Sequence, residues 1–270
     1  MKKKIFLLGF ILVMAFTLGC RREVPHLILA TTTSVENSGL LDALIPVFEK
    51  EAEARVDVIA CGTGKAIRLA ENGDCDLILV HDPEAEERFV KEGYGVNRKS
   101  IMYNDFVIVG PEDDPAKIKG IGGVIPALST IAHKKAPFIS RGDDSGTHKR
   151  EKQLWEKAGL IPGGEWYQET GQGMGATLVI ASQKRAYCLT DRATYLSYKD
   201  KFSLISLYEK DNLLYNPYSV ILVNPEKFLH TNYRWGIEFI NFLISDKGKK
   251  IIREFGKAEF GEPLFHPMGE

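Results

Sequence analysis

Short apolar runs, small polar loops and amphipathic stretches follow one another along the first part of the chain. Residues 26–30 predict a buried strand, and the apolar positions of residues 39–53 recur at helical spacing, with Pro46 predicting a kink or a break. Residues 56–60 and 77–80 predict two further strands, each followed by an amphipathic helix. Three units of strand, loop and helix predict a doubly wound α/β sheet, in which ligands bind beside the carboxyl ends of the strands.

The remaining residues predict a second lobe. Residues 101–109 are too long and too apolar a run for a loop, so we expect a strand that leaves the first lobe. A second α/β pattern follows, with helices near 122–134, 146–158 and 173–183, strands over 137–140, 186–190 and 218–223, and closing helices over 233–244 and 246–255. We predict that residues 20–110 and 217–270 form lobe 1, that residues 111–216 form lobe 2, and that a cleft lies between them.

Composition and the first twenty residues place the protein outside the cytoplasm. The chain has 270 residues, 44% hydrophobic and 26% charged, which is typical of a globular protein. Its only long apolar run, residues 5–18, is shorter than the roughly 20 residues of a membrane-spanning helix and follows three lysines. Cys20 after Leu18-Gly19 resembles a bacterial lipoprotein processing box. We interpret residues 1–19 as a removed signal peptide and Cys20 as a lipid anchor, with a plain signal peptide as the alternative.

Charge, cysteine and histidine patterns narrow the function classes. Removal of the three lysines lowers the formal net charge from −1 to −4, and no basic block remains beyond Arg21-Arg22, which argues against a nucleic-acid partner. Cys61 and Cys75 could pair, or all three remaining cysteines, Cys188 included, could be small buried hydrophobes. The six histidines show no metal-ligand spacing, so we expect no protein-bound metal ion and no cofactor.

Three predicted strand ends share small hydroxyl-bearing and glycine residues just before a helix, at residues 31–34, 62–64 and 141–147. The start of a helix leaves backbone N–H groups without partners and carries about half a positive charge, so small residues there let an anion approach closely. Each loop alone could be an ordinary helix cap or turn. Arg141 adds a full charge, although beside two aspartates it could form a surface ion pair worth at most about 1 kcal/mol. Together the loops predict an oxyanion site between the lobes.

At these residues the chain resembles the tungstate-binding lipoproteins that feed ABC importers. The resemblance covers nearly the whole mature chain, and it rests on residues 31–34, 102–111, 140–148, 169–178 and 189–192. It implies a two-lobed periplasmic binding protein of type II-like architecture that closes by a hinge motion on one tetrahedral oxyanion in the cleft between its lobes. It also implies a non-enzymatic receptor that delivers tungstate, or molybdate, to an ABC permease. Tungsten would enter as the oxyanion only, and we expect a monomer held at the membrane by Cys20.

The resemblance and the helix-start argument together give a predicted ligand set. The family associates the hydroxyl run and the arginine matching Arg141 with the ligand, and the helix starts add the other loops. The set is Thr31, Thr32, Thr33, Ser34, Thr63, Gly64, Arg141, Ser145, Gly146, Thr147, Gly175, Ala176 and Thr177. Tungstate carries no proton at neutral pH, so such a site should offer hydrogen-bond donors and no inward-facing carboxylate.

Two other functions stay open at this point. The spacing of Arg141, Asp143 and Ser145 also resembles the loop of phosphate-binding proteins, and Asp143 could accept a hydrogen bond from protonated phosphate or orient Arg141 from behind. An extracellular phosphoester hydrolase or transferase using Ser145 or His148 is the alternative from another class. It lacks a nucleophile and base at a recognised spacing, so we assign no catalytic residue.

Overall fold

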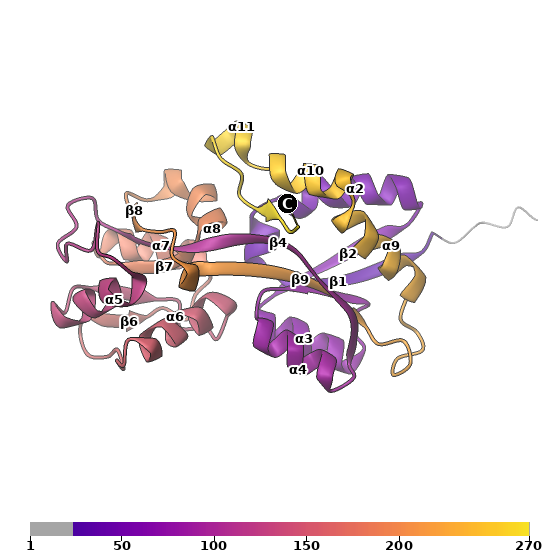
Figure 1. Ribbon diagram of the computed structural model, residues 1–270, viewed down its shortest axis with the longest axis horizontal. Coiled ribbons are helices and arrows are strands. Elements are labelled where there is room, and N and C mark those ends of the chain that lie inside the picture. Colours follow the sequence, from indigo (N-terminus) through magenta and orange to yellow (C-terminus); the bar gives the residue numbers. More distant parts are fainter. Residues whose placement is uncertain (1–23, 270) are drawn as a thin grey trace, which may run out of the picture.

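Two α/β lobes lie side by side in the computed structural model, which describes residues 24–269 (Figure 1). Lobe 1 is the part built on strands β1 (His26–Thr32), β2 (Arg55–Cys61) and β3 (Leu77–Val80). Lobe 2 is the part built on β5 (Phe138–Ser140), β6 (Tyr167–Glu169), β7 (Cys188–Asp191) and β8 (Ile205–Tyr208). The expected two-lobed α/β architecture is confirmed. The expected signal peptide, residues 1–19, and the anchor Cys20 lie outside the described residues.

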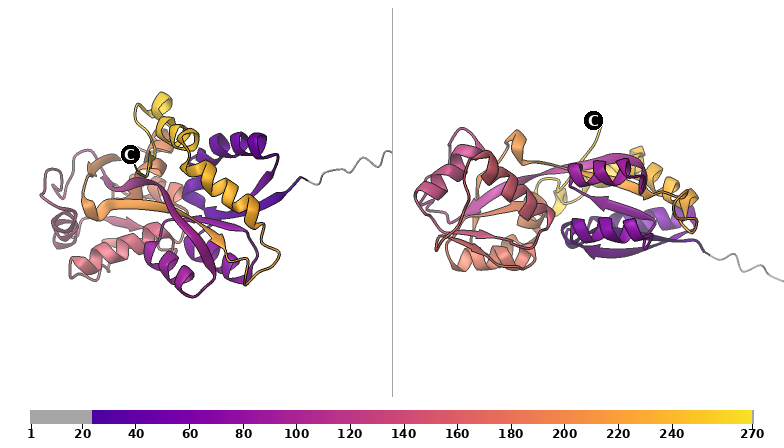
Figure 2. Two further views of the ribbon diagram at one scale, coloured as in Figure 1. Left: turned by 45° about the vertical axis from the view of Figure 1, so that its right-hand side comes forward. Right: turned by 90° about the horizontal axis from the view of Figure 1, so that it is seen from below.

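Two long strands connect the lobes. β4 (Gly95–Gly110) pairs antiparallel with β9 (Tyr215–Val223), while its last residues, Phe106 to Gly110, pair with β7 and β8 of lobe 2. In Figures 1 and 2 these two strands pass from one lobe to the other, so they are where a hinge motion between the lobes would occur. The predicted division of the chain at residues 110 and 217 falls at the lobe 2 ends of these strands and stays a prediction.

The sheet of lobe 1 is mixed. Its strand order is β2-β1-β3-β9-β4-β10, where β10 spans His266–Pro267. The strands β1, β2 and β3 are parallel, as the repeated strand and helix pattern predicts, whereas β9 is antiparallel to both β3 and β4. The antiparallel strand arises because β9 returns from lobe 2 and enters the sheet between β3 and β4.

Helices cover both faces of this sheet, which explains why β3 is apolar at every position. Leu77 and Leu79 contact the cluster under α2 (Leu40–Ala52), α9 (Tyr233–Ile244) and α10 (Asp246–Glu254). Ile78 and Val80 contact the opposite cluster, under α3 (Thr63–Asn72) and α4 (Pro83–Lys91), as the placement of these helices in Figure 1 shows. Strands buried on both faces form continuous apolar runs, and each fully buried aliphatic side chain stabilises the fold by roughly 1.5–3 kcal/mol.

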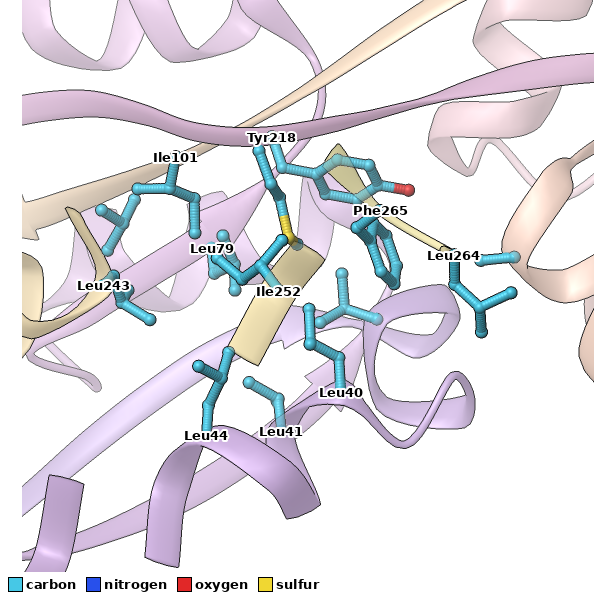
Figure 3. Close-up of a cluster of buried hydrophobic side chains, with 14 of the residues drawn as sticks. Leu40, Leu41, Leu44, Leu79, Ile101, Tyr218, Leu243, Ile252, Leu264 and Phe265 are labelled. Carbon is cyan, nitrogen blue, oxygen red and sulfur yellow. The ribbon is translucent and has the colours of Figure 1, made fainter. Parts of the chain in front are cut away.

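The C-terminal part of the chain completes the core of lobe 1. Figure 3 shows Leu40 of α2, Leu79 of β3, Ile252 of α10 and Phe265 around one apolar centre. The sequence predicts a kink or a break at Pro46; helix α2 continues through this residue, so it is not broken there. Pro46 lies on the exposed side of the helix, where water can satisfy the carbonyl group that loses its backbone partner.

Lobe 2 has its own aromatic core. Its helices are α5 (Val124–His133), α6 (Gly146–Lys157), α7 (Met174–Gln183) and α8 (Arg192–Ser197). Trp155 of α6 packs edge-on against Phe138, with ring centroids 5.3 Å apart. The buried carboxylate of Glu151 accepts hydrogen bonds from Trp155 Nε1 (3.1 Å) and the Tyr167 hydroxyl (2.8 Å), and burial raises its pKa to about 7. These contacts fix α6, whose first turn faces lobe 1.

The elements that the sequence pattern does not predict are all short. They are α1 (Thr33–Asn37), β6, α8, the 3-10 helices η1 (Lys199–Lys201) and η2 (Asn212–Leu214), β8, α11 (Lys257–Phe260) and β10. Each is too short to show a helical or strand period. Strand β4 begins at Gly95, six residues before the predicted start at residue 101. The apolar pattern does not include residues 95–100, because they are partly exposed and lack the apolar run of the buried part.

Two further features of the described part of the chain bear on function. Between residues 24 and 269 no helix has both the length and the apolar character needed to cross a membrane. The thiols of Cys61, Cys75 and Cys188 are free and buried, so these cysteines pack as small hydrophobic residues.

Candidate functional site

Four helices begin near the space between the lobes. In lobe 1, α1 follows β1 directly and α3 follows β2 after Gly62. In lobe 2, α6 begins after the loop that carries Arg141, and α7 begins after Gly173. The parallel strands β1 and β2 end at the same edge of the sheet, which is why the first two helix starts are neighbours.

A cavity of about 530 Å³ is lined by residues of both lobes. The lining consists of Thr33 and Asn37 of α1, Gly62, Gly64, Lys65 and Arg68 at the start of α3, Arg141, Asp143 and Asp144 of the loop before α6, Lys149 of α6, and Gly173. We call it the cleft cavity. Lysine and arginine side chains outnumber carboxylates in its lining, and three helix starts contribute, so the cavity favours an anion.

Arg141 connects the two lobes in the cleft cavity. It is only 6% exposed, its Nε donates to Asp143 Oδ2 (2.8 Å), and its Nη2 lies 3.5 Å from Thr33 Oγ1 across the cleft. The second oxygen of Asp143 accepts a hydrogen bond from the backbone N–H of Ser145 (3.1 Å). Asp143 therefore fixes the orientation of Arg141 while it also lines the cavity, and the interpretation of Arg141 as a surface ion pair is wrong.

Thr63 lies at the first position of α3 with an unused hydroxyl. Its side chain is fully buried, and its Oγ1 has no hydrogen-bond partner. The preceding residue, Gly62, offers no side chain to cap the helix, so the first N–H groups of α3 lack a side-chain acceptor. A buried hydroxyl without a partner costs roughly 1–3 kcal/mol. The start of α3 thus holds donors for which the described residues provide no side-chain partner.

The run of four hydroxyl residues divides between the sheet and helix α1. Thr31 Oγ1 donates to the carbonyl oxygen of Leu79 (2.8 Å), so its hydroxyl is used inside the sheet. Thr32 caps α1 by accepting from the Val35 N–H, and its Oγ1 lies 3.0 Å from Ser34 Oγ. Of the four predicted residues in this run, Thr33 is the one that lines the cleft cavity.

The predicted residues at the start of α6 lie at the contact between the lobes. Ser145 caps the helix by accepting from the His148 N–H (3.4 Å), and Thr147 is buried. Gly146 packs on the imidazole of His81 in lobe 1, so close that a Cβ there would lie 2.6 Å from the ring. Their backbone N–H groups, more than their side chains, are what this helix start can offer an anion.

The predicted residues of α7 form a more distant part of the site. Gly173 lines the cleft cavity, whereas Gly175 packs on the ring of Tyr198 and Ala176 is exposed. Thr177 Oγ1 bonds to Thr170 Oγ1 (2.9 Å) and to the carbonyl oxygen of Gly173 (3.1 Å). The structure thus brings Thr33, Gly64 and Arg141 of the predicted set to the cavity wall, with the buried Thr63 beside Gly64 in the chain, and gives Thr31 and Thr177 other partners. The assignment of the full set to the ligand stays a prediction.

Sequence reasoning did not single out three cations of the cavity lining, Lys65, Arg68 and Lys149. Lys65 and Arg68 are three residues apart in the first two turns of α3, which places them on one face of the helix. Basic residues at that spacing, directly after a glycine-rich helix start, are a sequence pattern from which Lys65 and Arg68 could have been predicted. Lys149 could not have been found in this way, because its place depends on the approach of the lobes.

No cluster of three or more His, Cys, Asp or Glu side chains within residues 24–269 is arranged to hold a metal ion. The cavity combines hydrogen-bond donors and four cationic side chains with two carboxylates, Asp143 and Asp144, so the expectation of a site without carboxylates is not met in its lining. Two lobes connected by two strands, with donors from both facing one cavity, define the class of two-lobed solute-binding proteins.

Comparison with known proteins agrees with this class. A family model described as a PBP superfamily domain matches residues 21–247. The tungstate-binding protein TupA of Peptoclostridium acidaminophilum is 46% identical over 243 residues, which are 89% of this chain and 85% of that protein. The structure of the tungstate ABC transporter from Geobacter sulfurreducens is 49% identical with a TM-score of 0.79, and the match covers 85% of this chain and 98% of that one.

A second solved structure, the tungstate-binding protein TupA from Desulfovibrio alaskensis G20, is 44% identical with a TM-score of 0.80, and the match covers 92% of this chain and 100% of that one. The chain belongs to the PBP superfamily and, within it, to the family of the tungstate-binding proteins TupA. The resemblance that the sequence motifs indicate is confirmed.

Proposed function

We propose that this protein is the solute-binding component of a tungstate importer and captures tungstate in the cleft cavity. The observation that carries the proposal is the buried Thr63 hydroxyl without a partner at an uncapped helix start, whose flanking residues Gly62 and Gly64 line the cleft cavity together with Arg141. Hydrogen bonds to a charged group each contribute roughly 1.5–3 kcal/mol, so several of them can offset the dehydration of a dianion. The names of the relatives support the choice of tungstate among oxyanions.

The two carboxylates of the cavity lining bear on the choice between tungstate and phosphate. Phosphate near neutral pH keeps a proton and would need an acceptor in the site. Both oxygens of Asp143 already accept hydrogen bonds, from Arg141 Nε and from the Ser145 N–H. Asp144, the other carboxylate of the cavity lining, pairs with Lys152 (2.9 Å). Each carboxylate oxygen has two lone pairs, so both aspartates keep acceptor capacity for protonated phosphate, and the titration with four anions decides between the two ligands.

Calorimetric titration of the purified protein with four anions tests the proposal. We expect a one-to-one complex with tungstate, comparable or weaker binding of molybdate, and far weaker binding of phosphate and sulfate. Comparable heats for all four anions would remove the selectivity claim. Phosphate binding that follows one protonation state between pH 5 and 8, without tungstate binding, would favour the phosphate receptor instead.

A receptor role fits the local geometry better than catalysis. Ser145 Oγ accepts a hydrogen bond from the backbone N–H of His148, and the imidazole Nδ1 of His148 accepts one from the backbone N–H of Asp144 (3.0 Å). The serine and the histidine are thus engaged with the backbone at the helix start and do not form a nucleophile and base pair. We propose a non-enzymatic function.

We also propose that the protein is anchored outside the cytoplasmic membrane by a lipid on Cys20 and hands its ligand to an ABC permease. The sequence of residues 1–20 and the ABC transporter named among the relatives support this. Cells grown with labelled palmitate should yield labelled protein, and Cys20→Ser should abolish both the label and the membrane association. Unlabelled wild-type protein in the culture medium would indicate a plain signal peptide.

A further inference from the structure

We propose that Asp82 and Lys149 form a latch that holds the two lobes closed on the anion, so that both act as positioning residues for the ligand. The proposal rests on the proposed function, because it assigns a conformational role around the same cavity. The Asp82–Lys149 latch is accompanied by a second contact between the lobes, between His81 of lobe 1 and Gly146 of α6 in lobe 2.

The ion pair joins the lobes at short distance. Lys149 Nζ lies 2.8 Å from Asp82 Oδ2, and the Asp82 side chain is 13% exposed. Burial alone would raise the pKa of Asp82, but the hydrogen bond from Lys149 and its positive charge hold that pKa below its ordinary value. The pair is therefore ionised at neutral pH; its carboxylate is shielded from water, whereas the Lys149 side chain is 35% exposed.

A second contact lies one turn earlier on the same helix. The ring of His81 fills the space where a side chain at residue 146 would stand, with its Cε1 2.6 Å from an ideal Cβ. His81 is itself fixed, because it stacks on Tyr218 with ring centroids 4.8 Å apart and its Nδ1 lies 2.9 Å from Asn216 Oδ1. Glycine at position 146 thus permits an approach of the lobes that any other residue would obstruct.

The latch is linked to the hinge strands by buried hydrogen bonds. Asn216 of β9 donates from Nδ2 to Asn104 Oδ1 of β4 (2.7 Å) and to the hydroxyl of Tyr218 (3.0 Å). Asn104 and Asn216 are register partners in the antiparallel pair that connects the lobes. His81 therefore rests on the hinge itself, and its contact with Gly146 has one defined geometry.

The latch also touches the ligand site. Lys149 lines the cleft cavity, and Gly146 begins the helix that follows the loop of Arg141. A contact that forms only in the closed state stabilises that state, and a ligand that requires both lobes then binds more tightly by the same factor. Loss of the Asp82 carboxylate should therefore weaken anion binding without removing a hydrogen bond to the anion.

Asp82→Asn gives a test in which the latch and simple electrostatics predict opposite signs. Removing a negative charge near an anion site would, by charge alone, strengthen anion binding. If the ion pair holds the lobes closed, the tungstate dissociation constant should instead rise about threefold to tenfold. Asparagine keeps the oxygen with which Asp82 caps α4 at Ala85 N, and it is an equally good capping residue, so the fold should be preserved.

A double-mutant cycle separates the pair from the individual charges. Lys149→Met should also weaken tungstate binding, and the double variant with Asp82→Asn should be no weaker than Lys149→Met alone. Lys157→Met is the matched control, because Lys157 is an exposed residue of the same helix and does not line the cleft cavity. It should change the dissociation constant less than Lys149→Met does.

Small-angle scattering measures the closure of the two lobes on adding tungstate, and a local structural defect would not shift the tungstate concentration at which closure occurs. Wild-type protein should contract on adding tungstate, and Asp82→Asn should reach the contracted state only at higher tungstate concentration. Unchanged or tighter tungstate binding in Asp82→Asn overturns the latch while leaving the proposed function intact. Failure of the wild type to bind tungstate overturns the proposed function first.

Discussion

Replacing Arg141 with alanine is expected to weaken tungstate binding by about 2–5 kcal/mol, the cost of truncating one partner of a buried charge contact. Arg141 is nearly buried, its guanidinium lies within reach of Thr33 in the opposite lobe, and Asp143 fixes its orientation. The variant loses a full positive charge and leaves Asp143 without its partner beside the anion. Both effects lower affinity, and titration calorimetry measures their sum.

Two comparisons sharpen the Arg141 prediction. Arg141→Lys keeps the charge but loses the fixed fork of donors, so its affinity should lie between those of the wild type and the alanine variant. Arg185→Ala removes an arginine of lobe 2 that forms an exposed pair with Asp113, and it should leave the dissociation constant unchanged. An Arg141→Ala protein that binds tungstate like the wild type would remove Arg141 from the site.

The longer elements of the fold follow from periodicity, and the exceptions have physical causes. Helix α9 has the bounds that the sequence predicts, because its apolar stripe packs continuously against the sheet. The direction of β9 could not be predicted, since an apolar strand has the same pattern in either direction. Pro46 does not break helix α2, because it lies on the exposed side, where water replaces the lost backbone hydrogen bond.

At the site, the helix starts were predictable and the inter-lobe contacts were not. Small residues before a helix mark where an anion can approach, and this pattern pointed to residues 62–64 and to the loop of Arg141. The sequence does not reveal which hydroxyl is already used: Thr31 bonds to the Leu79 carbonyl group, and Thr63 bonds to nothing. Nor does it reveal that His81 packs on Gly146, because that contact joins residues 65 positions apart in different lobes.

This difference between the two threonines leads to the second prediction. Thr63→Val replaces a buried, unpartnered hydroxyl by a methyl group of similar shape, so the free protein should be equally stable or up to about 1 kcal/mol more stable. Tungstate binding should nevertheless weaken by roughly 1.5–3 kcal/mol, because the anion loses a charge-assisted hydrogen bond. Thermal unfolding without ligand and calorimetry with tungstate measure the two effects separately.

Thr31→Val is the natural comparison, since both threonines are fully buried in lobe 1. The Thr31 hydroxyl donates to Leu79 O inside the sheet, so its loss leaves a buried carbonyl group short of a donor and should destabilise the free protein by about 1 kcal/mol. Its effect on tungstate affinity should be smaller than that of Thr63→Val. If Thr63→Val instead lowered the stability of the free protein and left affinity unchanged, its hydroxyl would serve the fold, and the start of α3 would not be an anion site. A hydroxyl that serves only the ligand is buried without a partner in the free protein and gains a partner in the complex. Its removal should therefore raise the stability of the free protein and lower the affinity for the anion.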